Sequence, residues 1–575
     1  MKLTLTSIIE KNGPDLAKAL ARVKAEPEAK RTIEEKIGKA QMKIAESREL
    51  DEKGEALKAR EAKTEAIRYY IEAAKEARAQ YTSNGRTEDL AKYAQIKATV
   101  ITINEEIIQA DEKRGEVDYQ RWAEISKHRS ETAAAHLQAK DREGVIEQYT
   151  KAAEAAENAS DILLGNIETL KRAVDQRKQE LQGERTITIT KILNGKITEE
   201  SELLTANTKV GEIDRELERL NLRNQRERIA NLEKIAQMQK LRVAAYQEIV
   251  KNAAEKEIPL KAAAIASIRV ADQYTEIVAL HVREGETIKT IEPLMQIGEA
   301  VANAAELQEE AGNEILALGH SARAATAFMR AAQVEFQVDW DSASTSDRFK
   351  KAVERATQIK KKILGSDKED VMERLVVATI MINAAVEFRH DDSLEVVKLS
   401  EDKLNGATSK SEIVQDEIAK IRAKILRRKA EDQHHLGNYK EAETAFSELM
   451  EIKCKLGEMD ESQKKRQINI EMALEYRKVA GSWLNAALGE MSKNPEKATK
   501  SISYANAHIG REETHLIRAI EMSSTIEQKL ELIDELLAQA NKVLAVVKIA
   551  GLKDQEEVHV RKIARLKSSI EQLRK

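Results

Sequence analysis

The stretch HHLGNYKEAETAF, residues 434–446, indicates how this chain folds. Gly437 is a small residue at a place where two helices are expected to touch, and Ala442 and Phe446 follow it at a spacing that places both on one face of a helix. A small residue lets two helix backbones approach each other, and an aromatic residue one turn later fills the groove between them. The stretch therefore predicts a hairpin of two packed helices.

The same spacing occurs at three other places in the chain. From Gly312 to Ala324, and from Ala324 to Phe328, the intervals are 12 and 4 residues. A second copy begins at Gly54 with the same intervals, and a third includes Val145. Across the four copies we expect the packing of paired helices to depend on Gly54, Ala66, Tyr70, Val145, Tyr149, Gly312, Gly319, Ala324, Phe328, Gly437, Ala442 and Phe446.

This pattern resembles the tetratricopeptide repeat, which has a small residue in the first helix, then a turn, then A-x3-F in the second helix. The family's first Trp and closing Pro are absent from all four copies, which lie 79, 179 and 118 residues apart. The resemblance implies an all-α fold, an irregular solenoid of helical hairpins with degenerate copies between the clear ones. Candidates for such copies are the segment after Pro495 and the apolar segment 375–388.

The resemblance also implies where a partner would bind, because in this family the first helices line a concave groove. The candidate groove residues are Glu309, Asn313, Leu316, Lys424, Arg427, Glu431 and His434. Arg427 and Asn313 suit the family's clamp for peptide C-termini, but Glu309 and Glu431 place negative charge where that clamp needs neutral or basic groups. We therefore do not predict that specific activity.

The composition agrees with a helical chain. Only 5 of the 575 residues are proline and 22 are glycine, which is too few for a protein rich in loops or strands. Charged residues make up 34% and aromatic residues 3%, so the cores must be thin and built from Ala, Leu, Ile and Val. A chain of this length exceeds one compact core, and a repeat stack avoids that limit by growing in one dimension.

We expect four regions along the chain. These are an N-terminal helical cap at 1–46, helical hairpins at 47–182, a central region at 183–255 and a C-terminal repeat domain at 256–575. The central region contains one long helix over about 212–254, with apolar residues at partly heptad spacing interrupted by Asn224 and Glu227. This helix packs either on its own chain or in an intermolecular coiled coil.

The segment 185–198 has two interpretations. Residues 186–190 alternate Thr and Ile, and Asn194 with Gly195 is a strong hairpin turn, so a small β-hairpin is one prediction. The other is a helix end with an Asn-Gly cap, because an isolated two-stranded hairpin is only marginally stable.

No motif for catalysis or for binding a cofactor is present. The sequence lacks the glycine-rich phosphate loops, H-E-x-x-H and paired C-x-x-C. His434 and His435 are adjacent, so on a helix they point about 100° apart and cannot easily share a metal ion. The Asp-rich stretch 338–347 lacks the Gly and closing Glu of a calcium loop, so we expect a capped loop there. We predict no enzyme activity, no cofactor and no metal.

Charge and cysteine content indicate which partners and which cellular compartment to expect. The chain has 95 basic and 99 acidic residues, interleaved to a net charge of −4, which argues against nucleic-acid binding. The single Cys454 fits a reducing compartment, and no export signal is evident, so we expect a cytoplasmic protein. The basic, amphipathic segment 560–575 either packs on the last hairpin or contacts a partner or an anionic membrane surface.

These observations predict a non-enzymatic scaffold that binds other proteins. One alternative is a protein that binds itself, as a homo-oligomer or as a filament, coat or cytoskeletal-like polymer. Another is a trafficking-type helical adaptor, on the strength of strings such as EAIRYYIEAAKEA at 65–77 and EGVIEQYTKAAEAAE at 143–157.

Overall fold

The computed structural model describes residues 14–115, 118–193, 200–343, 345–365, 368–405, 407–491 and 494–574. Within these ranges every regular element is a helix, and no strand is found. The all-α fold class is therefore confirmed. Contacts divide the chain into two compact units, unit 1 over 1–327 and unit 2 over 328–575.

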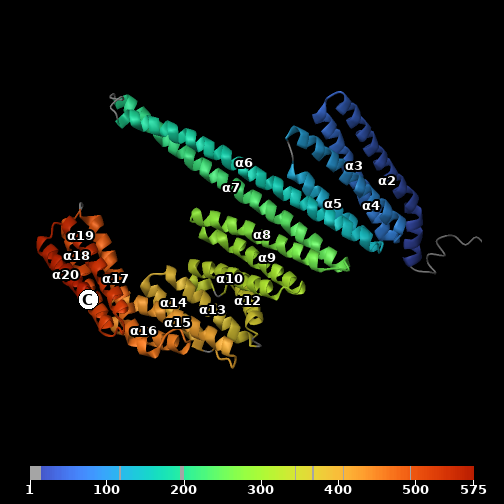
Figure 1. Cartoon of the computed structure of the whole chain (residues 1–575). Coiled ribbons are helices and arrows are strands. Elements are labelled where there is room, and N and C mark those ends of the chain that lie inside the picture. The colour runs from blue at the N-terminus through green and yellow to red at the C-terminus, as the bar shows by residue number, and fades with distance from the viewer. Residues whose placement is uncertain are drawn as a thin grey trace, which may run out of the picture. The chain divides into compact units, whose positions relative to one another are not determined.

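Unit 1 is a series of helices in which each helix from α2 to α8 packs against the next α-helix (Figure 1). Its elements are α2 (Pro14–Glu52), α3 (Ala56–Asn84), α4 (Thr87–Arg114), α5 (Tyr119–Gln138), α6 (Arg142–Leu193), α7 (Glu200–Asn252), α8 (Glu257–Arg283), η1 (Thr287–Thr290), α9 (Ile291–Glu310) and the first part of α10 (Glu314–Val338). Alanine and isoleucine are the commonest residues of the α2–α3–α4 core, where Ala66, Ala73, Ala74 and Ala77 are fully buried. Small side chains thus let these helices pack closely.

The longest elements, α6 and α7, run side by side (Figure 1). Near the rest of unit 1 their seam is apolar, with Leu163 and Ile167 against Leu232 and Ile235. The long helix expected over about 212–254 is thus confirmed as part of α7, and it packs on its own chain.

The β-hairpin interpretation of 185–198 is wrong on its N-terminal side, because residues 186–190 lie in α6. The Thr186, Thr188 and Thr190 hydroxyls each donate to the carbonyl four residues earlier, which satisfies them inside a helix. The turn residues Asn194 and Gly195 lie outside the described residues. Leu181 is buried and α6 packs against α7, so packing between these helices, and not the alternating Thr-Ile pattern, determines the structure of this segment.

Unit 2 contains the rest of α10 and a second series of helices (Figure 1). Its elements are α11 (Trp340–Ala343), α12 (Asp347–Leu364), α13 (Glu369–Ala384), η2 (Ala385–Glu387), α14 (His390–Asn405), α15 (Glu412–His435), α16 (Tyr439–Lys455), η3 (Glu461–Gln463), α17 (Lys464–Glu490), α18 (Pro495–Glu521), α19 (Ile526–Ile549) and α20 (Lys553–Arg574). The Asp-rich stretch forms a capped turn, since Asp339 Oδ1 accepts the Ser342 N–H at 3.3 Å. No described helix is both long and apolar enough to cross a membrane.

The hairpin residues quoted first form the α15–α16 pair. Ala442 and Phe446 of α16 are fully buried and cluster with Leu426 and Ala430 of α15. In the other copies Ala66, Tyr70, Val145, Tyr149, Ala324 and Phe328 are also buried.

The glycines of the copies have a different role from the expected one. Gly54, Gly312 and Gly437 are exposed in turns at φ of 76°, 80° and 85°, where they give conformational freedom rather than packing. Gly319 is exposed on α10, and a Cβ added there would meet nothing within 4 Å. Helix contact therefore depends on the alanines and aromatics.

Candidate functional site

The candidate groove residues of α15 form an ion-pair network. Arg427 lies 3.0 Å from Glu471 and 3.5 Å from Glu431, and Glu431 also lies 3.7 Å from Lys478. Lys424 is exposed beside this network. Arg427 is therefore already neutralised within the chain, which weakens it as a clamp for an incoming carboxylate.

The candidate groove residues near Gly312 lie in unit 1. The Asn313 side chain donates to Gln308 Oε1 at 2.8 Å, so it helps to close the turn after α9. Leu316 is 53% exposed and Glu309 is exposed at the end of α9. Of this set, Leu316 is the residue that offers apolar surface to a partner.

His434 does not line an open groove, because it is 1% exposed. Its ring lies edge-on to Tyr439 and Tyr476, with centroids 5.0 and 4.3 Å away. Both ring nitrogens are buried, and neither has a hydrogen-bond partner among the described residues. Burial, with help from neighbouring positive charge, lowers the pKa of His434 to about 3, so the ring is neutral.

His434 belongs to a larger group of rings that sequence reasoning missed. His508 and His515 of α18 flank Tyr476 at centroid distances of 6.1 and 5.6 Å. Arg511, between them in sequence, lies 4.5 Å from the Tyr439 ring. The spacing of 508, 511 and 515 along one helix face was visible in the sequence, but nothing there indicated that α18 faces α16 and α17.

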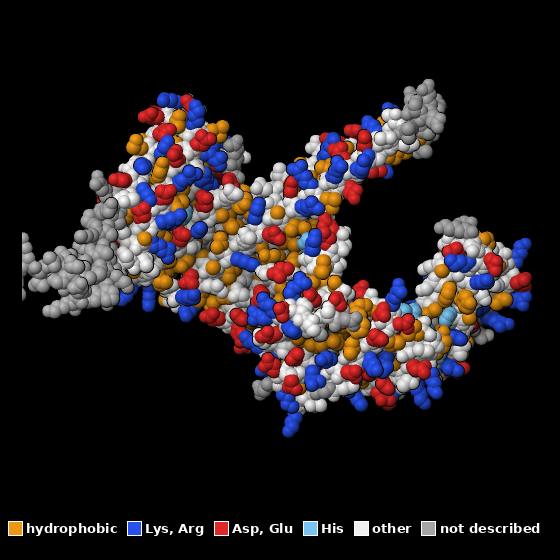
Figure 2. Space-filling model, turned by 180° about the vertical axis from the view of Figure 1, so that it is seen from behind, with side chains coloured by type: hydrophobic (Ala, Val, Ile, Leu, Met, Phe, Trp, Pro, Cys, Tyr) orange, Lys and Arg blue, Asp and Glu red, His pale blue; other side chains and the backbone are white. Residues whose placement is uncertain are grey.

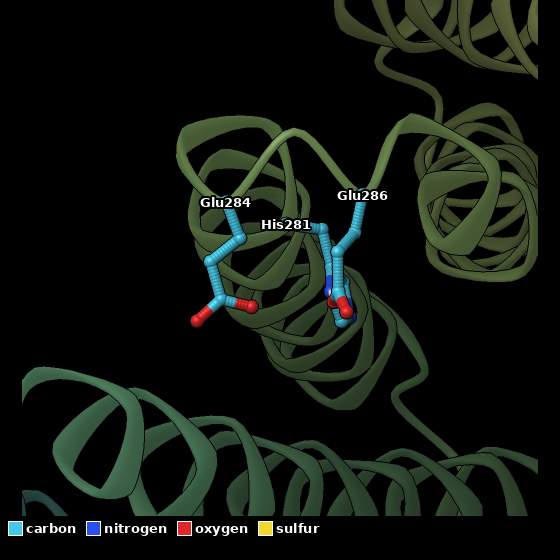
Figure 3. Close-up of side chains that lie close together, drawn as sticks. All are labelled: His281, Glu284 and Glu286. Atoms are coloured by element: carbon cyan, nitrogen blue, oxygen red, sulfur yellow. Dashed lines mark hydrogen bonds and ion pairs between the residues drawn. The ribbon is translucent and has the colours of Figure 1, made fainter. Parts of the chain in front are cut away.

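One cluster of three potential metal ligands lies at the end of α8. A ligand atom from each of His281, Glu284 and Glu286 lies within 4.8 Å of the others (Figure 3). Glu286 already accepts a hydrogen bond from Lys289 at 2.5 Å and lies 3.1 Å from His281 Nδ1. Because an ammonium group already balances this carboxylate, we assign no metal to the cluster.

The largest apolar hollow among the described pockets lies between α12 and α13 and has a volume of about 490 Å³. Its floor consists of Phe349 and Val353 from α12 with Val377 and Met381 from α13, each 5–8% exposed. The two residues of each pair are four apart, so each helix presents one apolar face to the hollow. This spacing was visible in the sequence, but which helices face each other was not.

The rim of this hollow is charged with both signs. Lys350 and Lys403 supply positive charge, and Glu354, Glu369 and Glu373 supply negative charge. Elsewhere, too, the face seen in Figure 2 mixes the two signs rather than gathering one of them. The α12–α13 pocket thus combines an apolar floor with a polar edge, as ligand and partner sites do.

Comparisons with known proteins give no family. No family model and no curated protein matches the chain. Similar solved structures include a circular tandem repeat protein with novel repeat topology and enhanced subunit contact surfaces, at 13% identity and TM-score 0.17 over 94% of this chain and 97% of that one. The structure of Naa15/Naa10 bound to HypK-THB matches with 11% sequence identity and a TM-score of 0.17 over 96% of each chain. The structure of the APC/C hetero-tetramer Cut9-Hcn1 matches with 12% sequence identity and a TM-score of 0.18 over 80% of this chain and 95% of that one. Scores this low place the chain in no family, and the tetratricopeptide resemblance stays a prediction.

Proposed function

We propose that this chain is a non-enzymatic scaffold for protein–protein interaction and that a partner docks in the α12–α13 pocket. The supporting observation is the apolar floor of Phe349, Val353, Val377 and Met381 in a hollow of about 490 Å³. A hollow of this size accepts one or two large apolar side chains, which is how buried anchors hold a protein interface.

The rim defines the kind of partner segment. Glu369 already lies 3.7 Å from Lys361, whereas Glu354 and Glu373 make no ion pair with a described residue, so a segment with an apolar anchor flanked by Lys or Arg can pair with both. The anchor would supply affinity, whereas the rim charges would raise the association rate and select the partner.

Photo-crosslinking tests this site directly. A photoreactive residue replaces Glu354 at the rim and, as a matched control, Lys351, which is exposed on α12 but does not line the pocket. We expect position 354 to capture a defined protein that position 351 does not capture.

Affinity measurements with that protein complete the test. Glu373→Lys should weaken binding by about tenfold or more through loss of rim attraction, whereas Glu458→Lys, exposed elsewhere in unit 2, should leave it unchanged. Equal capture at both crosslinker positions, or binding insensitive to Glu373→Lys, contradicts docking at this pocket.

A further inference from the structure

We propose that a second pocket, between α3, α4 and α5 of unit 1, binds a small phosphate monoester. This pocket has a volume of about 310 Å³ and is independent of the partner site in unit 2. Its position follows from helix geometry. Lys75 and Arg78 lie three apart on α3, and Tyr93 and Lys97 lie four apart on α4, so each pair occupies one face of its helix.

The base of the pocket is a buried, balanced charge pair. Lys97 is 6% exposed, and its Nζ lies 2.5 Å from Glu131 and 3.1 Å from His128 Nδ1. Burial alone would raise the pKa of Glu131, but hydrogen bonds from His128 and Lys97 and the charge of Lys97 lower it to about 2. Glu131 therefore stays ionised and neutralises Lys97 within the chain.

The rim of the pocket, in contrast, has cations without counter-charges. Lys75 and Lys127 make no ion pair with any described residue. The Arg78 guanidinium lies over the Tyr93 ring, 5.6 Å from its centroid, and donates to the Tyr93 hydroxyl at 3.5 Å rather than to a carboxylate. The remaining acid, Glu124, lies 3.9 Å from Arg121.

The charge balance favours a doubly charged ligand. Four cations and two carboxylates line the pocket, with a net charge of +2 when His128 is neutral. A phosphate monoester is close to a dianion at neutral pH, because its second pKa is about 6. Arg78 can pair with two phosphate oxygens at once, and the lysines act as point charges beside them.

The size and walls of the pocket indicate that the ligand is larger than inorganic phosphate. A volume of about 310 Å³ accommodates the phosphoryl group and a small organic body. Ile71, which is partly exposed, supplies apolar surface for that body. Either a free phosphate ester or a phosphorylated side chain of a partner presents this chemistry.

Calorimetry on the full chain tests the proposal with two phosphate probes, phenyl phosphate and a short peptide with one central phosphoserine. Benzoate and the unphosphorylated peptide are the controls that lack the dianion. We expect each phosphate probe that fits to bind at least about tenfold tighter than its control, and to weaken as salt is added. Tighter binding of phenyl phosphate identifies a free ester as the ligand, and tighter binding of the peptide identifies a phosphorylated partner.

Matched variants decide whether the pocket is responsible. Lys75→Gln with Lys127→Gln removes the two unpaired rim cations, and we expect affinity to fall by about tenfold or more without loss of thermal stability. Lys171→Gln with Lys191→Gln removes two exposed lysines of α6 that lie outside the pocket, and we expect no change. If neither probe exceeds its control, or if the two double variants bind equally, the proposal is overturned.

Discussion

At the scale of single residues, unit 2 buries polar groups at a cost. Neither ring nitrogen of His434 has a hydrogen-bond partner among the described residues, and a buried polar group without a partner reduces stability by roughly 1–3 kcal/mol. Glu512 is 1% exposed and depends on Arg477, whose Nε donates to it at 2.8 Å. These side chains make the stability of unit 2 sensitive to pH and to single substitutions.

We predict that unit 2 loses stability on acidification and that His434→Phe reduces the loss. The folded pKa of about 3, set mainly by burial, lies below the unfolded value of about 6.5. The unfolded chain therefore binds a proton that the folded chain does not, so stability is full above about pH 6.5 and falls below it. From pH 7 to 5 this one group contributes about 2 kcal/mol of loss. Urea unfolding followed by a dye on Cys454, in α16, measures this, and an unchanged loss in His434→Phe would count against it.

A second residue prediction concerns the Arg477 pair. Arg477→Met leaves Glu512 buried without its cation, and we expect a loss of roughly 3–5 kcal/mol in the free energy of unfolding. Burial already raises the pKa of Glu512, while Arg477 opposes that shift, so the variant should also take up a proton more readily. Arg561→Met breaks the exposed pair with Glu557 and should cost at most about 1 kcal/mol. Similar losses in the two variants would contradict the prediction.

At the scale of elements, the turns decide where helices end. Lys140 is the one described non-glycine residue with positive φ, at 60°, and it occupies the place that Gly437 has in the α15–α16 turn. We predict that Lys140→Gly raises stability by up to about 1 kcal/mol and that Gly437→Ala lowers it by about 1–2 kcal/mol. Because a Cβ at Gly437 would meet nothing within 4 Å, that cost is conformational. Thermal unfolding of both variants measures the two changes in stability. A change in the same direction for both variants would contradict the prediction.

The sequence predicted elements better than it predicted sites. The Ala442 and Phe446 spacing located a packed hairpin because that information is local to two turns of helix. The Thr-Ile alternation was misleading, because threonine hydroxyls can bond within a helix and α7 covers the other face. Both pockets combine side chains from consecutive helices, and the pattern within one helix does not state which side chains of the next helix it faces.

At the scale of the whole molecule, the scaffold and self-assembly alternatives predict different masses. A scaffold with interleaved surface charge should show a molar mass that does not grow with concentration, either the 64.5 kDa of one chain or a fixed multiple of it. Light scattering after size exclusion, over a concentration series at low and high salt, measures this. Growth into large species would favour a self-assembling protein instead.

The α6–α7 pair has a consequence for how the chain opens. Beyond Ile167, the buried apolar residues of α6 are Val174 and Leu181, so only one residue in every seven is buried there. Exposed ion pairs such as Arg185 with Asp214 cover the seam there and contribute little. In hydrogen exchange, the amide protons of α6 beyond Leu181 should therefore exchange with deuterium first, and those beside Leu163 should exchange last, because local unfolding begins where few apolar side chains are buried.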